Sequence, residues 1–315
     1  MAEAWPDRIF SRYSEVSAAL REPNLAMVGA RPESRPEAGA ARTEIQAGLR
    51  PDRISAWQTR LESLAQEILN QAPRDRALDL IADFARPWCR SLAVMATGAD
   101  ESAGERLSEL AVDVSAATAD PYDAELRKRA AEASAQMEAF FPGHMPPRDA
   151  STFVALSQTL VCLLAKCWYE LVEHPDEIAR LRANPDWMPR AVEELLRFAG
   201  MPKAVFRRAV ADVEFGAVKI AEGDRVILEL AAANRDPVQF PDPDRLDVSR
   251  APGGQLSLGG SGLHSCVGGP LIRMAMGVAT SAWVARFAAA DHTAAVEWRG
   301  GPIFRWPAAV YIRLG

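Results

Sequence analysis

Residues 232–269 form a long segment that is rich in proline, glycine and aspartate and has neither helical nor strand periodicity. A segment of this length without regular structure inside a compact domain usually carries function instead of only connecting two elements. The chain before it is patterned mostly as helices, and the chain directly after it, 270–287, is again patterned as a helix. The sequence therefore favours a helical protein in which one irregular loop leads into one helix.

Helical periodicity extends through most of the first 200 residues. In 55–70, for example, Trp57, Leu61 and Leu64 recur on one face. The segment 142–147, with three prolines and a glycine, is expected to interrupt the pattern. Helices are predicted at 55–70, 79–89, 107–114, 122–141, 150–172, 174 onward, 187–198 and 270–287.

Strand patterning is confined to short stretches near the C-terminal third. Residues 213–220 and 224–230 alternate apolar and polar side chains and are separated by an Ala-Glu-Gly turn sequence. Residues 294–314 predict two further short strands around a Gly-Gly-Pro turn. The predicted fold class is α+β, mainly α, with a small β region.

Charge and targeting signals narrow the class of protein. The net charge of −6 argues against a general nucleic-acid binder, because phosphate neutralisation needs a basic surface. The N-terminus lacks a basic stretch followed by an apolar run, and the longest apolar segment, 153–172, contains Gln158, Lys166 and Glu170. We therefore expect a cytoplasmic protein that neither enters nor spans a membrane.

Cys266 lies in unusual sequence surroundings, within the glycine-rich segment 256–269. Glycines let a backbone turn tightly and approach a flat group closely. Backbone N–H groups just before a helix can donate to a sulfur atom and favour its thiolate form. Such a thiolate suits an axial haem ligand. The alternative is a glycine-rich surface turn beside a buried cysteine. Cys89, Cys162 and Cys167 are expected to be small core residues.

The order Gly-x-Gly-x-His-x-Cys-x-Gly over 260–268 resembles the ligand loop of cytochrome P450s of the bacterial soluble type. Three further motifs agree in type and order. They are Glu194-x-x-Arg197 on a predicted helix, Arg250 before the cysteine loop, and the run Ala-Ala-Asn-Arg-Asp-Pro over 232–237. The chain is identified as a short, atypical member of this superfamily, with the resemblance extending from about Ile9 to the C-terminal end.

The resemblance implies a single haem-thiolate domain over 1–315. A long helix over the haem would span 150–173, the Glu-x-x-Arg helix 188–199, and the meander with the ligand loop 232–269. It also implies that most of the family's N-terminal sheet and first helix are missing and that the lid region, 116–149, is short. A more open pocket, a larger or carrier-bound substrate, or a partner subunit completing the cover would each fit a short lid.

The implied cofactor is haem b, iron protoporphyrin IX, with Cys266 as the axial iron ligand. Gly260 and Gly268 would shape the ligand loop around the haem. His264 and Arg207 would bind the propionates. Arg42 is equally well explained as a propionate ligand or as an ordinary surface charge, because its companion histidine is replaced by Ala38. Glu194, Arg197 and Arg250 would form a structural ion-pair network.

The long helix departs from the family pattern. Alignment from His174-Pro175 places Ala155-Leu156 at the usual kink and Gln158-Thr159 at the usual acid–alcohol pair. Thr159 could hydrogen-bond dioxygen or a water molecule, but Gln158 cannot ionise and so cannot relay protons as a carboxylate does. The cysteine loop is also one residue longer than usual, with Gly259 at the expected aromatic position.

The leading hypothesis is a monooxygenase that oxidises a small organic molecule in specialised metabolism, with a ferredoxin-type electron donor. A second is haem-thiolate chemistry without classical monooxygenation, using peroxide or rearranging or dehydrating a substrate. A third is a non-catalytic family member that assists a partner enzyme. The substrate-pocket candidates, each of which could equally be a core residue, are Phe153, Leu156, Ala204, Val205, Phe206, Ile303 and Phe304.

Overall fold

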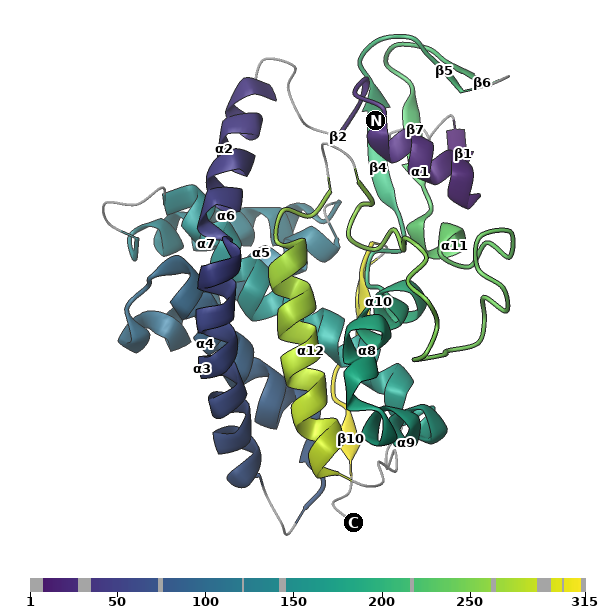
Figure 1. Ribbon diagram of the computed structural model, residues 1–315. Helices are drawn as coiled ribbons and strands as arrows, with labels where there is room; N and C mark the ends of the chain where they lie inside the picture. The colour runs from purple at the N-terminus through teal and green to yellow at the C-terminus, as the bar shows by residue number, and fades with distance from the viewer. Residues whose placement is uncertain are drawn as a thin grey trace.

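The computed structural model describes residues 8–27, 35–72, 76–120, 122–141, 146–215, 218–261, 265–287, 296–301 and 303–312. Within these ranges helices form most of the molecule. The main sheet and the β5–β6 hairpin lie at one end of it, whereas β10 lies near the other end (Figure 1). This confirms the predicted mainly helical α+β class. The helices are α1 (Tyr13–Arg21), α2 (Arg35–Gly48), α3 (Pro51–Asn70), α4 (Arg86–Thr97), α5 (Gly104–Ala119), α6 (Ala124–Glu138), α7 (Pro146–Val154), α8 (Leu160–Val172), α9 (Pro175–Ala183), α10 (Met188–Ala199), α11 (Leu230–Ala233) and α12 (Gly269–Arg286).

Four shorter helical segments complete this set. Two are π-helical: η2 (Leu80–Ala85) leads into α4, and η4 (Ala155–Thr159) joins α7 to α8. The other two are 3-10 turns, η3 (Glu101–Ala103) and η5 (Pro185–Trp187). The predicted long helix is therefore continuous from 146 to 172, with its hydrogen-bond pattern changed in the middle.

The main sheet has the strand order β1-β7-β4-β2. β1 (Arg8–Phe10) runs parallel to β7 (Arg225–Leu228), whereas β4 (Val205–Ala209) is antiparallel to both β7 and β2 (Leu25–Met27). Two of these four strands come from the N-terminal part of the chain, although most of that part of the family's sheet was expected to be missing. Three two-stranded sheets pair β5 (Val213–Phe215) with β6 (Val218–Ile220), β8 (Trp298–Gly300) with β9 (Arg305–Pro307), and β3 (Leu78–Asp79) with β10 (Tyr311–Ile312).

The strands differ from the predicted ones in several places. The segment 213–220 forms the hairpin β5–β6 instead of one strand, and β7 ends at Leu228, so that α11 begins at Leu230. β4 was not predicted, because its two central residues are arginines and the alternation of apolar side chains is lost. The expected strand pair in 294–314 is present as β8–β9, followed by β10.

α8 passes through the centre of the larger core. Its Trp168 stacks on Phe84 with ring centroids 5.6 Å apart, and its indole N–H donates to the hydroxyl of Thr280 on α12 (3.0 Å). Residues 149–172 are long and apolar enough to cross a membrane, but 72% of their most apolar window is buried inside the protein. This segment is therefore accounted for as a core helix.

The cysteine loop connects two hydrophobic cores. Leu256, the first residue of the loop 256–269, belongs to the smaller core, which α1 forms with the main sheet. Leu271, after the loop, belongs to the larger core around α8, α10 and α12. Burial at both ends fixes where the loop leaves and rejoins the body of the protein.

Candidate active site

The cysteine loop folds back on itself before α12. The N–H of Gly259 donates to the carbonyl oxygen of Leu256 (2.8 Å), and the N–H of Cys266 donates to that of Leu258 (2.7 Å). Gly259 and Gly260 adopt left-handed φ angles of 81° and 62°, which side chains with a Cβ rarely adopt. As a result, Cys266 lies three residues before the start of α12 with its side chain exposed.

The sulfur of Cys266 is not ionised by its surroundings alone. Desolvation by the loop raises the thiol pKa above its usual value. The N–H of Gly268, which donates to the sulfur, and the positive charges of Arg42 and Arg273 oppose this rise without reversing it. The expectation that backbone donors would favour a thiolate is therefore too simple, and a bound metal ion would have to displace the proton.

Among the described residues, no group of three or more His, Cys, Asp or Glu side chains could hold a metal ion. Cys89, Cys162 and Cys167 are buried, as predicted, and burial raises the pKa of Cys162 and of Cys167 to about 12. Cys266 is therefore the exposed thiol of this part of the chain. A metal site at Cys266 would need further ligands from a cofactor, as haem provides.

Arg207, on β4, is a buried cation without a carboxylate partner among the described residues. It is 4% exposed, its Nη1 donates to the carbonyl oxygen of Phe206 (3.0 Å), and its Nε has no hydrogen-bond partner. Desolvation lowers its pKa to about 10. Because an unpaired buried charge is costly, this position fits an anionic group such as a haem propionate.

Arg42 and His264 are the other two residues predicted to bind a propionate. Arg42 donates from Nη1 to the carbonyl oxygen of Ser265 (2.6 Å) and from Nη2 to its hydroxyl (2.8 Å). These bonds attach α2 to the residue just before Cys266, so Arg42 positions the loop from this side. His264 lies in 262–264, outside the described residues.

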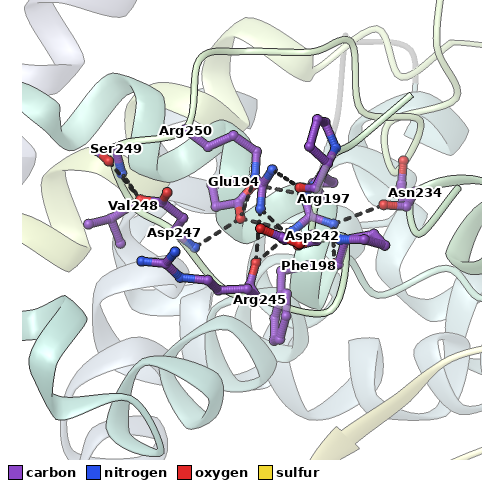
Figure 2. Close-up of polar contacts among 12 residues, drawn as sticks. Glu194, Arg197, Phe198, Asn234, Asp242, Arg245, Asp247, Val248, Ser249 and Arg250 are labelled. Carbon is purple, nitrogen blue, oxygen red and sulfur yellow. Dashed lines mark hydrogen bonds and ion pairs between the residues drawn. The ribbon is translucent and has the colours of Figure 1, made fainter. Parts of the chain in front are cut away.

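Glu194, Arg197 and Arg250 form a hydrogen-bonded network with the irregular segment that precedes the cysteine loop (Figure 2). Arg197 donates to both carboxylate oxygens of Glu194 (2.7 and 2.9 Å), and the Nε of Arg250 donates to one of them (3.0 Å). The remaining guanidinium N–H groups donate to carbonyl oxygens of the irregular segment, those of Asn234, Pro241, Asp242, Pro243 and Arg245. Two arginines thus satisfy backbone groups that no sheet or helix satisfies.

Two residues for which the sequence predicted no role of their own, Asn234 and Ser257, connect this network to the cysteine loop. Asn234 accepts from the N–H of Leu256 (2.8 Å) and donates to the hydroxyl of Ser257 (2.8 Å). That hydroxyl donates in turn to the carbonyl oxygen of Leu196 (2.5 Å). A Cβ at Gly200 would collide with the Ser257 hydroxyl and with Leu196, so glycine is required there. The sequence indicated Asn234 only as one residue of the motif 232–237 and predicted no contact for it.

In the long helix, η4 begins at the predicted kink and ends at Thr159. Ala155 is exposed and Thr159 is half-buried, although this helix is otherwise largely buried. The two lie one turn apart and so open to space on the same face. Gln158 is 8% exposed and donates from Nε2 to the carbonyl oxygen of Ser108 on α5 (3.2 Å).

The pocket candidates fall into two groups. Ala204, Val205, Phe206, Ile303 and Phe304 are all half-buried. Their two segments lie side by side, because Lys203 donates from its N–H to the carbonyl oxygen of Ile303 (3.2 Å) and Pro202 bridges to Phe304. Phe153 is 0% exposed and belongs to the large core, as the alternative of a core residue expects. Leu156 is likewise buried in this core.

The sequence and the fold of this chain were compared with those of known proteins. A family model described as Cytochrome P450 matches residues 158–297. Nocardicin C N-oxygenase of Nocardia uniformis subsp. tsuyamanensis is 32% identical, over 94% of this chain and 84% of its own length. The 6-deoxyerythronolide B hydroxylase of Saccharopolyspora erythraea is 33% identical over 75% of this chain, and the match spans 65% of the hydroxylase. The crystal structure of the LnmA cytochrome P450 hydroxylase from the leinamycin biosynthetic pathway of Streptomyces atroolivaceus superimposes with a TM-score of 0.85 at 27% identity, covering 96% of this chain and 89% of LnmA.

Proposed function

This chain belongs to the cytochrome P450 family of haem-dependent oxidoreductases, and from that premise we propose that it is a haem b monooxygenase that oxidises a small organic molecule in specialised metabolism. The observation that carries the proposal is the placement of Cys266, an exposed residue held between the hydrogen-bonded turn at Leu258 and the start of α12. Bound haem supplies the iron at which dioxygen is activated. Cys266 would hold this iron through its sulfur.

The chain's own residues divide the remaining tasks. Arg207 and His264 bind the propionates, and Arg42 holds the loop through Ser265. Gly260 keeps the loop compact, because its φ of 62° is left-handed and a Cβ there would lie 3.3 Å from the side chain of Leu256. Gly268 lies beside the Cys266 sulfur, to which its N–H donates. Thr159, on the open face of the long helix, orients oxygen or a water molecule with its hydroxyl.

We propose that substrate binds near the paired segments 204–206 and 303–304. Their side chains are mostly apolar and half-buried, which suits an apolar or aromatic group close to the haem. The substrate is a free small molecule or one attached to a carrier. We further propose that a ferredoxin-type donor docks on the Cys266 side, that the enzyme is cytoplasmic, and that a partner subunit could complete the short lid.

A second function is favoured by one observation. The amide of Gln158 replaces the usual carboxylate and donates to Ser108, so it offers no ionisable group for proton delivery. An enzyme that takes a peroxide as oxidant, or that rearranges or dehydrates its substrate, does not depend on that delivery. Substrate turnover by the holoenzyme separates the candidates: dependence on a ferredoxin and its reductase supports monooxygenation, and turnover with hydrogen peroxide alone supports the second function.

The carbon-monoxide difference spectrum of the dithionite-reduced protein tests the haem-thiolate assignment, with Cys266→Ser as the control. We expect a strongly red-shifted Soret band that is absent from the variant. Failure to bind haem, after expression with a haem precursor, would contradict both enzyme functions and favour a non-catalytic role beside a partner enzyme. A band typical of neutral-thiol or histidine ligation would contradict monooxygenation.

A further inference from the structure

α5 touches two other elements through backbone carbonyl groups. The carbonyl oxygen of Ser108 accepts the hydrogen bond from Gln158 in η4. The carbonyl oxygen of Ala119, at the end of α5, lies so close to Gly301 that a Cβ there would overlap it and would lie 3.1 Å from the Cβ of Asp120. Eleven residues separate Ser108 from Ala119, about three helical turns, so both lie on the same side of α5.

Gln158 is chemically suited to the first of these contacts. The carbonyl oxygen of Ser108 has two lone pairs, and the helix uses only one of them. An amide can donate to the second, whereas an ionised carboxylate has no proton to donate. Gln158 is largely buried, so its contact with Ser108 is shielded from competing water.

Gly301 makes the second contact from the tip of the β8–β9 hairpin. Its N–H donates to the carbonyl oxygen of Phe304 (2.9 Å), which closes the tip and places Phe304 beside Pro202. At the base of the hairpin, Trp298 packs on α8, with its ring centroid 5.2 Å from that of Tyr169 and 5.4 Å from the Nζ of Lys166. The hairpin is therefore held from several sides, and α5 rests on its tip.

We infer that Gln158 and Gly301 are positioning residues that fix α5 at both ends as a roof over the substrate pocket and thereby limit the size of substrate admitted. The inference rests on the proposed function, because it takes the space beside η4 and the hairpin tip as the pocket. It gives Gln158 a structural use in place of proton relay. It also makes α5 a fixed roof, not a freely moving lid.

Amide hydrogen exchange of the holoprotein tests whether the roof is fixed. Gln158→Met keeps the length of the side chain and removes the donor. We expect exchange in 104–119 to become about fivefold faster, the equivalent of one lost hydrogen bond. Gln136→Met is the matched control: it removes an exposed contact between α6 and Arg106 of α5 and leaves the bond from Gln158 to Ser108 in place. Equal exchange in wild type and Gln158→Met would overturn the inference.

Azole binding to the haem tests the size limit. Association rates of imidazole and of a bulky triaryl imidazole are measured by stopped-flow absorbance for wild type, Gln158→Met and Gly301→Ala. We expect the rate for the bulky ligand, relative to imidazole, to rise severalfold in both variants. The control Gly277→Ala, whose new Cβ would meet its neighbours at 3.8–4.0 Å, should leave the ratio unchanged.

The two measurements separate failure of the inference from failure of the proposed function. An unchanged ratio in a Gln158→Met protein that binds both azoles would overturn the inference alone. A wild-type protein that gives no azole spectrum would overturn the proposed function and the size limit with it. Gln158→Met carries the test if Gly301→Ala does not fold, because it adds no bulk.

Discussion

The side of the site that holds Cys266 and the side formed by α8 are stabilised by different forces. Near Cys266, Arg197 makes five hydrogen bonds, two to Glu194 and three to backbone carbonyl groups. On the α8 side the contacts are mostly apolar, and the buried hydroxyl of Ser157 has no partner within the described structure. Hydrogen bonds and ion pairs stabilise the first side, and the packing of apolar side chains stabilises the second. Removing a charge on the first side should therefore destabilise the fold, whereas replacing a half-buried polar group on the second, such as the Thr159 hydroxyl, should change chemistry at little cost in stability.

The largest effect that would sharpen this comparison is expected from Glu194→Gln. Glu194 and Arg197 are 1% and 3% exposed, and the variant leaves two guanidinium groups facing a neutral amide. We expect a loss of about 3–5 kcal/mol in the free energy of unfolding, measured in urea. The neighbouring Glu193→Gln, which removes a more exposed pairing with Arg273, should cost less than about 1 kcal/mol. Equal losses would contradict the distinction.

Arg207→Leu should separate haem retention from folding. Removing an unpaired buried cation should leave the apoprotein unchanged or stabilise it by about 1–3 kcal/mol. Haem should be lost at least tenfold faster, measured by transfer to apomyoglobin, because the propionate loses its partner. Arg208→Leu, at the exposed neighbouring position, should change neither quantity. Unchanged haem loss in Arg207→Leu would remove Arg207 from the site.

Alkaline pH should weaken the α8 side of the apoprotein through Cys162 and Cys167. Burial raises the pKa of each to about 12, above the value near 9 in the unfolded chain. The unfolded state therefore releases these protons first, and stability present below pH 9 is lost as the pH rises toward 12. We expect a slope of about 1.4 kcal/mol per pH unit for each thiol. The urea midpoint at pH 8–10.5 measures it, and a Cys162→Ala/Cys167→Ala double variant should flatten the curve.

The smallest effect on stability is expected from Thr159→Val. Its half-buried hydroxyl has no hydrogen-bond partner within the described structure, so unfolding should change by less than about 0.5 kcal/mol. If Thr159 orients oxygen, more of the reducing equivalents should be diverted to hydrogen peroxide. Thr280→Val is the contrast, since it leaves the buried indole N–H of Trp168 without its acceptor and should cost about 1–3 kcal/mol. A large stability loss in Thr159→Val would place the residue in the packing instead.

The sequence predicted the features that depend on a repeated pattern of residues or on a short motif. Periodicity located most of the helices, and motif order located Cys266 and the Glu194 network. The partners of Gln158 and Ser257 could not be predicted, because Ser108 and Leu196 lie 50 and 61 residues away in the chain. The arginines of β4 concealed a strand, because its place in the sheet is decided by its neighbours β2 and β7, and β2 lies about 180 residues earlier in the chain. Glu194 and Arg197 were weak signals individually and informative only in order with Arg250.

The two arginines that hold the carbonyl groups of the irregular segment also constrain the order of folding. Arg197 reaches the carbonyl groups of Asn234, Pro243 and Arg245 across 37–48 residues of sequence, so the segment cannot take its shape until α10 has formed. Contacts over such separations form late, because the loop that they close must first lose its conformational entropy. Substitutions in 235–253 should therefore accelerate unfolding and leave the folding rate nearly unchanged. Cys266 would reach its final position among the last residues of the chain to do so.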